Sequence, residues 1–263
     1  MNKTCSVCQT VFPGEKSQCP SCKNWNVALA TKGNDGTVTL DKVVSAERDR
    51  LITGPWDYCW GGGIVRTSVT MLGGLPGAGK STLLLQLAMC FCEAEPEREC
   101  MYIATEEAEE EIKLRADRLE IIHQPRIRIV PAMSGMANVG ESLMVHRPGF
   151  IILDSLQGMA GEDHATILEL LKVLKKVSKT LKAPSIVISH VNKAGDYAGL
   201  MTYQHAVDVL LTLAPDEDDG QRELFVRKNR FGRAFINLYF DMTDTGLVVA
   251  ERAAYDDEED EED

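Results

Sequence analysis

Apolar and polar positions along this chain change period in a regular way, from short apolar runs to segments with helical spacing. The runs are typical of strands buried in a sheet, and segment 165–181 places apolar residues at i, i+3, i+4 and i+7. Lysines occupy the other side of that segment, which indicates a solvated helix face. We expect strands at 69–72, 100–105, 127–130, 150–153 and 184–189, and helices at 83–88, 108–120 and 165–181.

The alternation of these elements predicts an α/β fold with a central, mainly parallel sheet. Segment 222–250 differs, because its polar and apolar residues alternate in the way typical of antiparallel strands. Most of the expected parallel strands end in a polar residue, and ligands of open α/β sheets bind at the carboxyl edge of the strands. We therefore expect the functional residues at that edge.

Residues 74–81 match the phosphate-loop pattern G-x-x-x-x-G-K-[ST], between an apolar strand and an apolar helix. In such a loop the glycine backbone N–H groups face phosphate oxygens, the lysine reaches the outer phosphates and the serine ligates magnesium. A glycine-rich turn that binds nothing is the alternative, and the lysine, the hydroxyl and both flanking elements disfavour it. The expected nucleotide-binding residues are Gly74, Gly77, Ala78, Gly79, Lys80, Ser81 and Thr82.

Carboxylates follow two of the expected strands. Asp154 closes the strand FIILD about seventy residues after the phosphate loop, where a phosphate-loop site places its second magnesium-organising carboxylate. Glu106 follows strand 100–105, which we expect beside the loop strand, and could orient a water that attacks the γ-phosphate. Glu107 is adjacent and stays open as the alternative, and both could also form the acidic first turn of the next helix.

Four cysteines near the N-terminus form two knuckles. Cys5-x-x-Cys8 and Cys19-x-x-Cys22 are separated by ten residues, a spacing that suits a tetrahedral, structural zinc site. A disulfide framework is the alternative, but it is typical of secreted proteins and conflicts with the cytoplasmic location that we expect from the composition. The other cysteines, Cys59, Cys90, Cys92 and Cys100, lack ligand spacing and are expected to be reduced thiols.

Composition limits the function classes. The chain has 263 residues, 44% of them hydrophobic, and lacks both a secretory signal and an apolar run of about 18 residues, so we expect a cytoplasmic protein. The formal charge is −12, and the segment DDEEDEED at 256–263 contributes much of it. The body is therefore only mildly acidic, and any contact with nucleic acid would come from a local patch or a ring lumen.

Several motifs together resemble the bacterial RadA/Sms family of RecA-like DNA-repair ATPases, from residue 5 to about residue 250. KNRFG, and the cysteine module beside a phosphate loop, are the most specific of them. The motifs are CPSCKNWN (19–26), GGG (61–63), GGLPGAGKSTLLLQ (73–86), MYIATEEAEEEIKLRADRL (101–119), IILDSLQ (151–157), SHVNKAGDYAG (189–199) and KNRFG (228–232).

The resemblance implies a RecA-like ATPase that uses ATP and Mg²⁺ and carries zinc in its cysteine module. It makes Lys80 and Glu106 catalytic and Asp154 the second carboxylate. It also makes Lys228 and Arg230 fingers that enter the ATP site of a neighbouring subunit. Such fingers require a head-to-tail homo-oligomer, a ring or filament that is expected to be a hexamer.

The same resemblance places a DNA-facing, nucleotide-sensing loop after His190, in which Lys193 would contact a phosphate and Tyr197 would stack on a base. A structural His190 is the alternative. The family continues into a Lon-protease-like domain after the equivalent of residue 250, so the resemblance is to a short form without it. We expect a zinc module at 1–30, a linker at 31–50, the core at 51–250 and an acidic, disordered tail at 251–263.

The function expected from the resemblance is a DNA-dependent ATPase acting on single-stranded or branched DNA in recombination, repair or replication, with helicase or translocase activity as its expected form. Two alternatives stay open: a DnaB-type replicative helicase, and a non-motor adaptor that uses ATP as an assembly switch. In the adaptor, the zinc module or the acidic tail would bind a replication or recombination protein. The tail could also be merely solubilising, or could mimic DNA.

Overall fold

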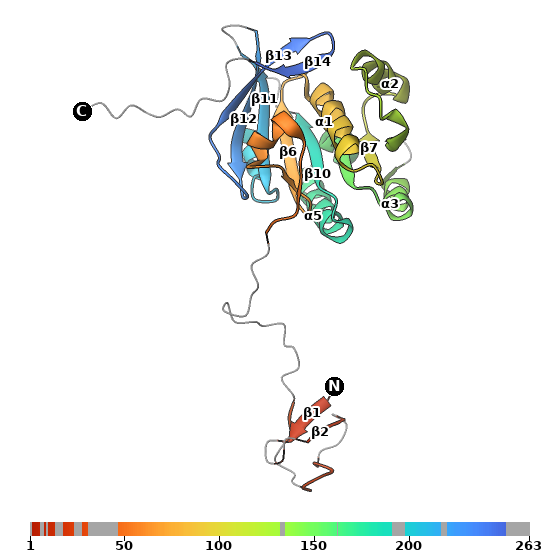
Figure 1. The fold of residues 1–263 in the computed structure, drawn as a ribbon, viewed down its shortest axis with the longest axis vertical. Coiled ribbons are helices and arrows are strands. Elements are labelled where there is room, and N and C mark those ends of the chain that lie inside the picture. The colour runs from red at the N-terminus through yellow and green to blue at the C-terminus, as the bar shows by residue number, and fades with distance from the viewer. Residues whose placement is uncertain are drawn as a thin grey trace, which may run out of the picture. The chain divides into compact units, whose positions relative to one another are not determined.

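The computed structural model describes residues 2–5, 8, 10–13, 18–23, 28–30, 47–131, 135–161, 163–190, 198–216 and 220–250 (Figure 1). The chain divides into two compact units, Met1–Glu47 and Arg48–Asp263. In the first unit, β1 (Asn2–Cys5) pairs antiparallel with β2 (Val11–Pro13) and with β3 (Ala28–Ala30). Among the described residues of this unit, Cys5, Phe12 and Cys19 form a buried cluster.

The second unit is built on a nine-stranded sheet with the order β14-β13-β12-β11-β6-β10-β9-β7-β8. The six strands from β11 to β8 in that order run parallel, and β12, β13 and β14 extend the sheet antiparallel. The predicted α/β fold with a mainly parallel sheet is therefore confirmed. The strands are β6 (Val69–Gly74), β7 (Cys100–Ala104), β8 (Ile127–Pro131), β9 (Phe150–Asp154), β10 (Ser185–His190), β11 (Val209–Pro215), β12 (Arg222–Asn229), β13 (Asn237–Thr243) and β14 (Gly246–Val249).

The expectation that strand 100–105 lies beside the loop strand is wrong. β10 and β11 flank β6, and both β10 and β9 separate it from β7. Sequence neighbours need not pair in a doubly wound sheet, because the crossover helices can carry the chain past strands that are added later. Glu106 nevertheless lies near Asp154, since the Thr105 backbone N–H donates to the Asp154 carbonyl at 2.8 Å.

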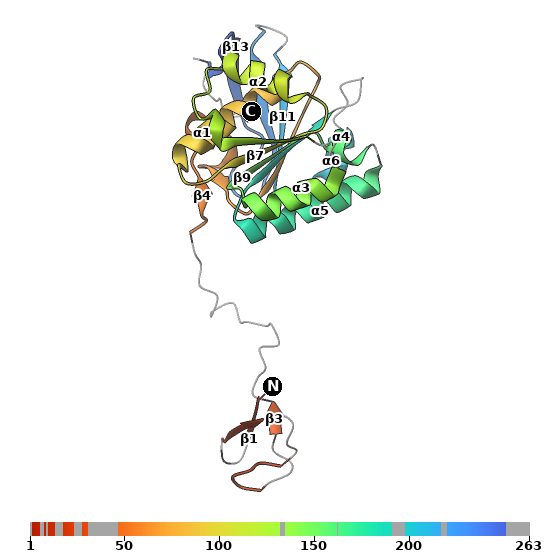
Figure 2. The same cartoon turned by 90° about the vertical axis from the view of Figure 1, so that its right-hand side faces the viewer.

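Helices cover both faces of the sheet (Figure 2). α1 (Lys80–Ala94) and α2 (Glu109–Arg118) pack on one face, and α3 (Gly135–His146), α4 (Leu156–Ala160), α5 (His164–Leu181) and α6 (Ala198–Tyr203) on the other. The parallel strands alternate between these two cores, as Leu72 and Met71 do. This double burial explains why their sequences are continuously apolar. Among the described helices, none is long and apolar enough to cross a membrane.

Short elements bring the triple glycine against the KNRFG segment. β4 (Arg50–Leu51) pairs with β5 (Ile64–Val65), and the 3-10 helix η2 (Gly54–Trp60) lies between them in the chain. Another described 3-10 helix, η3 (Gln124–Arg126), precedes β8. Arg50 donates to the Gly63 carbonyl at 2.7 Å and to the Phe231 carbonyl at 3.0 Å. A Cβ on Gly61 would lie 2.7 Å from the Cα of Gly232. Gly61 and Gly63 therefore belong to the surface on which the turn after β12 packs.

We expect Gly61→Ala to destabilise the second unit more than Gly62→Ala. Both glycines have positive φ, 69° and 96°, so each alanine costs about 1 kcal/mol in backbone strain. Only the Gly61 variant adds an overlap with backbone atoms, which raises its cost to about 2–4 kcal/mol. Urea denaturation of both variants measures this difference, and equal losses of stability would contradict the packing argument.

Candidate nucleotide site and metal centre

The phosphate loop connects the carboxyl end of β6 to the first turn of α1. Gly77 and Gly79 have φ of 79° and 103°, a region that favours glycine. A Cβ on Gly79 would also lie 2.6 Å from the Met242 side chain. The Lys80 side chain is buried, and its Nζ donates to the carbonyls of Gly74 and Leu75, each at 2.8 Å. The local backbone is therefore built to expose N–H groups beside a lysine ammonium.

Lys80 is set between opposing electrostatic effects. Burial lowers its pKa, while the negative charges of Asp154 and Glu106 raise it. An anion at the loop would act in the same direction as those carboxylates and favour the protonated form. The buried Lys80 ammonium is therefore positioned to bind an anion at the loop, unlike a lysine on the open surface.

Asp154, at the end of β9, and Ser81, in the first turn of α1, bring two side-chain oxygens together. The Ser81 hydroxyl donates to Asp154 Oδ2 at 2.8 Å, and the Tyr102 hydroxyl donates to the same oxygen at 2.6 Å. Burial, and then the charge of Asp154, raise the pKa of Tyr102 well above its usual value, which keeps it a donor. Hydroxyl and carboxylate oxygens are the ligands that Mg²⁺ prefers, so Ser81 and Asp154 fit that ion. Tyr102 was not identified from the sequence as a partner of Asp154, because a tyrosine is an ordinary residue in an apolar strand.

The two neighbouring glutamates have different surroundings. Glu106 contacts the Ser155 hydroxyl, and both of its carboxylate oxygens lie 3.1 Å from His190 Nε2. Glu107 accepts two hydrogen bonds from Arg115, at 2.6 and 2.7 Å, and lines the cavity beside the phosphate loop. This bidentate pair is the main reason that the pKa of Arg115 is raised. Glu106 is therefore the carboxylate that shares its surroundings with Asp154, through Ser155.

A cavity of about 480 Å³ opens beside the loop. Arg115 and Arg118 of α2 reach it, and Arg118 also donates to the Asp244 carbonyl at 2.6 Å in the turn between β13 and β14. Two cations three residues apart on one helix share a face, which is the only sequence signal for this pair. The lining residues are Gly77, Gly79, Ser81, Thr82, Glu107, Arg115, Arg118, Met242, Thr243 and Asp244.

Lys228 and Arg230 lie at the opposite edge of the sheet from the phosphate loop. Asn229 pairs with Val209, which pairs with Thr70 at the start of β6, whereas the loop follows Gly74 at its end. Five strand residues correspond to about 15 Å, so these cations do not face the phosphate loop of their own chain.

Asp208 organises this opposite edge. Its carboxylate accepts from Lys175 at 2.8 Å, from the Val69 backbone N–H at 3.1 Å and from Arg230 at 3.3 Å. The Lys228 ammonium donates to the Val207 carbonyl at 2.9 Å, and burial lowers its pKa. Asp208 was not singled out from the sequence, because its partners come from three other elements.

Several of the residues singled out from the sequence lie in segments that the structure does not describe. Lys193 and Tyr197 lie outside the described residues, as do most of the expected linker and all of the expected acidic tail. His190 is described at the end of β10, where its backbone N–H donates to Gln157 at 3.2 Å. It is the last described residue before the segment in which a DNA-facing loop is expected.

In the N-terminal unit, Cys5, Cys8, Cys19 and Cys22 converge with all four sulfur atoms within 4.8 Å of one another. The Cys5–Cys22 and Cys8–Cys19 Sγ distances are 3.4 and 3.6 Å. Tetrahedral zinc with Zn–S bonds of about 2.3 Å separates its sulfurs by about 3.8 Å, so the cluster fits this ion. Hydrogen bonds with Thr10 lower the pKa of the Cys8 thiol to about 6, which favours the thiolate that zinc needs.

Comparison with known protein families identifies the family of the chain. Residues 37–196 match the family model described as an AAA domain. The chain belongs to this AAA domain family. The matched range contains the phosphate loop, Glu106, Asp154 and His190, whereas Lys228 and Arg230 lie beyond it.

The resemblance to RadA is also confirmed. DNA repair protein RadA from Chlamydia pneumoniae is 31% identical over 264 residues, 93% of this chain and 57% of that protein. RadA from Haemophilus influenzae is 31% identical over 271 residues, 92% of this chain and 58% of that protein. The chain thus spans under two thirds of the length of these relatives.

A solved structure of a KaiC-like protein from Pyrococcus horikoshii shares the fold. Its TM-score is 0.64 at 18% identity, and the match covers 78% of this chain and all of that one. At this identity the likeness supports the RecA- and KaiC-like architecture alone.

We expect the purified chain to hold one zinc ion, and Cys19→Ser to lose it, because a three-thiolate site binds zinc much more weakly. Cys90→Ser is the matched control, since Cys90 is half-buried in α1 and far in sequence from the cluster. Metal content by inductively coupled plasma mass spectrometry measures both. A wild-type chain without zinc, or a Cys19 variant with a full complement, would contradict the prediction.

Proposed function

We propose that the core binds ATP with Mg²⁺ and hydrolyses it in an oligomer assembled on single-stranded or branched DNA, in recombination, repair or replication. The observation that carries the proposal is the convergence of Lys80, Ser81, Asp154 and Glu106 at one edge of the sheet. The relatives from Chlamydia pneumoniae and Haemophilus influenzae both carry the name DNA repair protein RadA, which supports the biological setting.

In this proposal each residue has one task. The loop backbone and Lys80 hold the phosphates, and Ser81 and Asp154 hold the ion. Magnesium bound there neutralises charge on the outer phosphates. Glu106 orients the attacking water and takes its proton, and Ser155 and His190 fix the position of the carboxylate.

Glu106 is preferred over Glu107 because of their partners. Both oxygens of Glu107 accept hydrogen bonds from Arg115, so they are already engaged and less free to orient a water. Glu106 instead contacts groups that can exchange hydrogen bonds with a water or a phosphate oxygen.

Lys228 and Arg230 act in trans in this proposal. Their position at the other edge of the sheet means that they can meet a nucleotide only on a neighbouring copy. The Arg230 side chain is 46% exposed despite its contact with Asp208, so it keeps donors for an anion. A cation supplied across an interface stabilises the charge that develops on the γ-phosphoryl group.

DNA would act through the segment after His190, where Lys193 and Tyr197 are the proposed contacts. His190 contacts Glu106, so a shift of this segment on DNA would change the position of the catalytic carboxylate. This route for DNA-dependent hydrolysis combines the loop expected from the sequence with the observed contact between Glu106, which follows β7, and His190, which ends β10.

Single-turnover ATP hydrolysis with and without single-stranded DNA tests the proposal. We expect DNA to stimulate the wild-type chain, and Glu106→Gln to lower the rate about 100-fold or more while nucleotide still binds. Glu107→Gln is the matched control and should retain most activity. If the wild-type chain binds ATP but never hydrolyses it, the adaptor alternative is favoured; unwinding of a forked duplex would favour a helicase.

The trans arrangement predicts complementation between two inactive variants. Lys80→Ala lacks a working phosphate loop, Arg230→Ala lacks the finger, and each should be inactive alone. In a 1:1 mixture about a quarter of the interfaces would combine an intact loop with an intact finger, so activity should return to that fraction. A mixture as inactive as its components, in oligomers shown to exchange subunits, would rule the arrangement out.

A further inference from the structure

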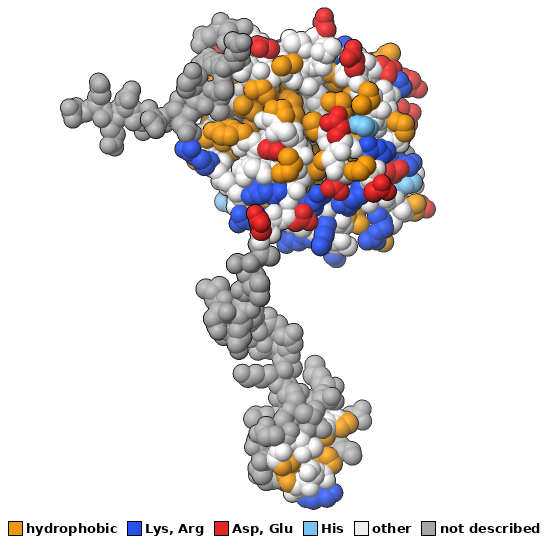
Figure 3. All heavy atoms as spheres, in the orientation of Figure 1, with side chains coloured by type: hydrophobic (Ala, Val, Ile, Leu, Met, Phe, Trp, Pro, Cys, Tyr) orange, Lys and Arg blue, Asp and Glu red, His pale blue; other side chains and the backbone are white. Residues whose placement is uncertain are grey.

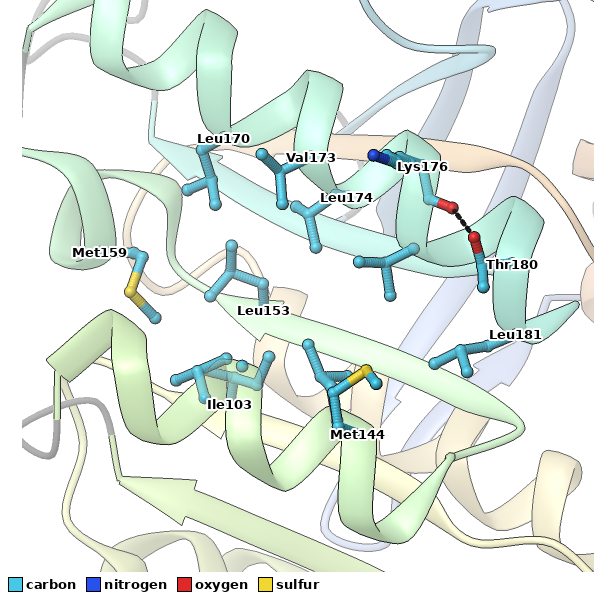
Figure 4. A pocket seen from close by; sticks show the side chains of 14 residues that line it. Ile103, Met144, Leu153, Met159, Leu170, Val173, Leu174, Lys176, Thr180 and Leu181 are labelled. Carbon is cyan, nitrogen blue, oxygen red and sulfur yellow. Dashed lines mark hydrogen bonds between the residues drawn. The ribbon is translucent and has the colours of Figure 1, made fainter.

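An apolar groove lies between α3 and α5, on the face of the sheet opposite α1 (Figure 4). The groove has a volume of about 320 Å³, and Ile103 and Leu153 form its floor. Met144 and Val173, from the two facing helices, are 71% and 46% exposed. The Thr180 hydroxyl donates to the Lys176 carbonyl at 2.9 Å within α5, so it requires no partner from outside. The groove therefore offers hydrocarbon to an incoming side chain.

Lysines border this groove. α5 carries four lysines and one glutamate, and that glutamate, Glu169, is already paired with Lys172 at 3.4 Å. Lys176 and Lys179 are exposed and form no ion pair with any residue that the structure describes. Figure 3 shows basic side chains gathered along the lower margin of the second unit, over α5. A partner for this surface should combine an apolar side chain with carboxylates.

α2 has this combination. Leu114 is 63% exposed, and Glu110 and Glu111 precede it by one helical turn, so the three share one side of the helix. Neither glutamate has an ion-pair partner in the described part of the chain. Residues 106–120 contain seven carboxylates and three cations. Leu114 thus matches the hydrocarbon of the groove, and Glu110 and Glu111 match its lysines.

The positions of α2 and of the α3–α5 groove also suit a head-to-tail contact between copies. α2 borders the cavity at the phosphate loop through Arg115 and Arg118. α5 supplies Lys175 to Asp208, which also holds Arg230. A contact that brings Arg230 of one copy to the phosphate loop of the next therefore also brings α5 toward α2.

We infer that α2 of one copy docks in the α3–α5 groove of the next, with Leu114 in the groove and Glu110 and Glu111 on Lys176 and Lys179. The inference rests on the proposed function, because it locates the interface that the trans fingers require. Such a contact is heterologous, so each copy uses one surface on either side and the assembly continues until it closes.

Charge reversal tests this pairing. Glu110→Lys with Glu111→Lys, and separately Lys176→Glu with Lys179→Glu, should each weaken assembly at least tenfold, because like charges then face one another. All four changes in one chain restore opposite charges and should restore assembly. Glu93→Lys with Glu97→Lys is the control, since it changes the net charge equally at exposed positions outside α2. Sedimentation velocity with Mg²⁺ and a non-hydrolysable ATP analogue, with and without single-stranded DNA, measures the assembly.

The outcomes separate the interface from the proposed function. A wild-type chain that stays monomeric under all these conditions overturns both. A wild-type chain that assembles while both charge-reversed pairs assemble equally well overturns the interface alone, as does failure of the fourfold variant to recover. Lower DNA affinity of the α5 variant with unchanged assembly would identify the lysines as a nucleic-acid surface instead.

Discussion

The Asp154 carboxylate is the point on which the candidate site depends. It closes β9, accepts from Ser81 at the first turn of α1 and from Tyr102 inside β7, and so joins three elements through one oxygen. A carboxylate that is 8% exposed is stable only when its charge is compensated by donors or a cation. The same arrangement that makes the folded site stable also presents hard oxygen ligands beside the phosphate loop.

The two edges of the parallel sheet carry complementary chemistry. Phosphate loop, carboxylates and the arginines of α2 lie at the carboxyl edge, and Lys228, Arg230 and Asp208 lie at the amino edge. Within one copy these groups are separated by the length of the strands. In our proposal a complete site needs both edges, so it would form only between two copies of the chain.

Contacts between segments distant in the sequence hold the triple glycine (61–63) against the turn after β12, and the pattern of residue types does not reveal them. Gly61 packs against Gly232, and Arg50 joins the triple glycine to the turn after β12. These contacts link segments about 170 residues apart. Two motifs that look independent in the sequence therefore pack together, next to Lys228 and Arg230 in the chain.

The sequence alone determined five of the six parallel strands, the α/β class, the cysteine cluster and the phosphate loop, because each depends on local spacing, on burial of both sheet faces or on short-range backbone conformation. It did not predict α3, α6 or β11. It favoured Glu106 and kept Glu107 as the alternative, and it placed strand 100–105 beside the wrong neighbour. Only the tertiary structure decided strand order, paired Glu107 with Arg115, gathered Asp208 with Lys175 and Arg230, and formed the α3–α5 groove. Those features depend on contacts between residues distant in the chain, which spacing along a single sequence does not specify.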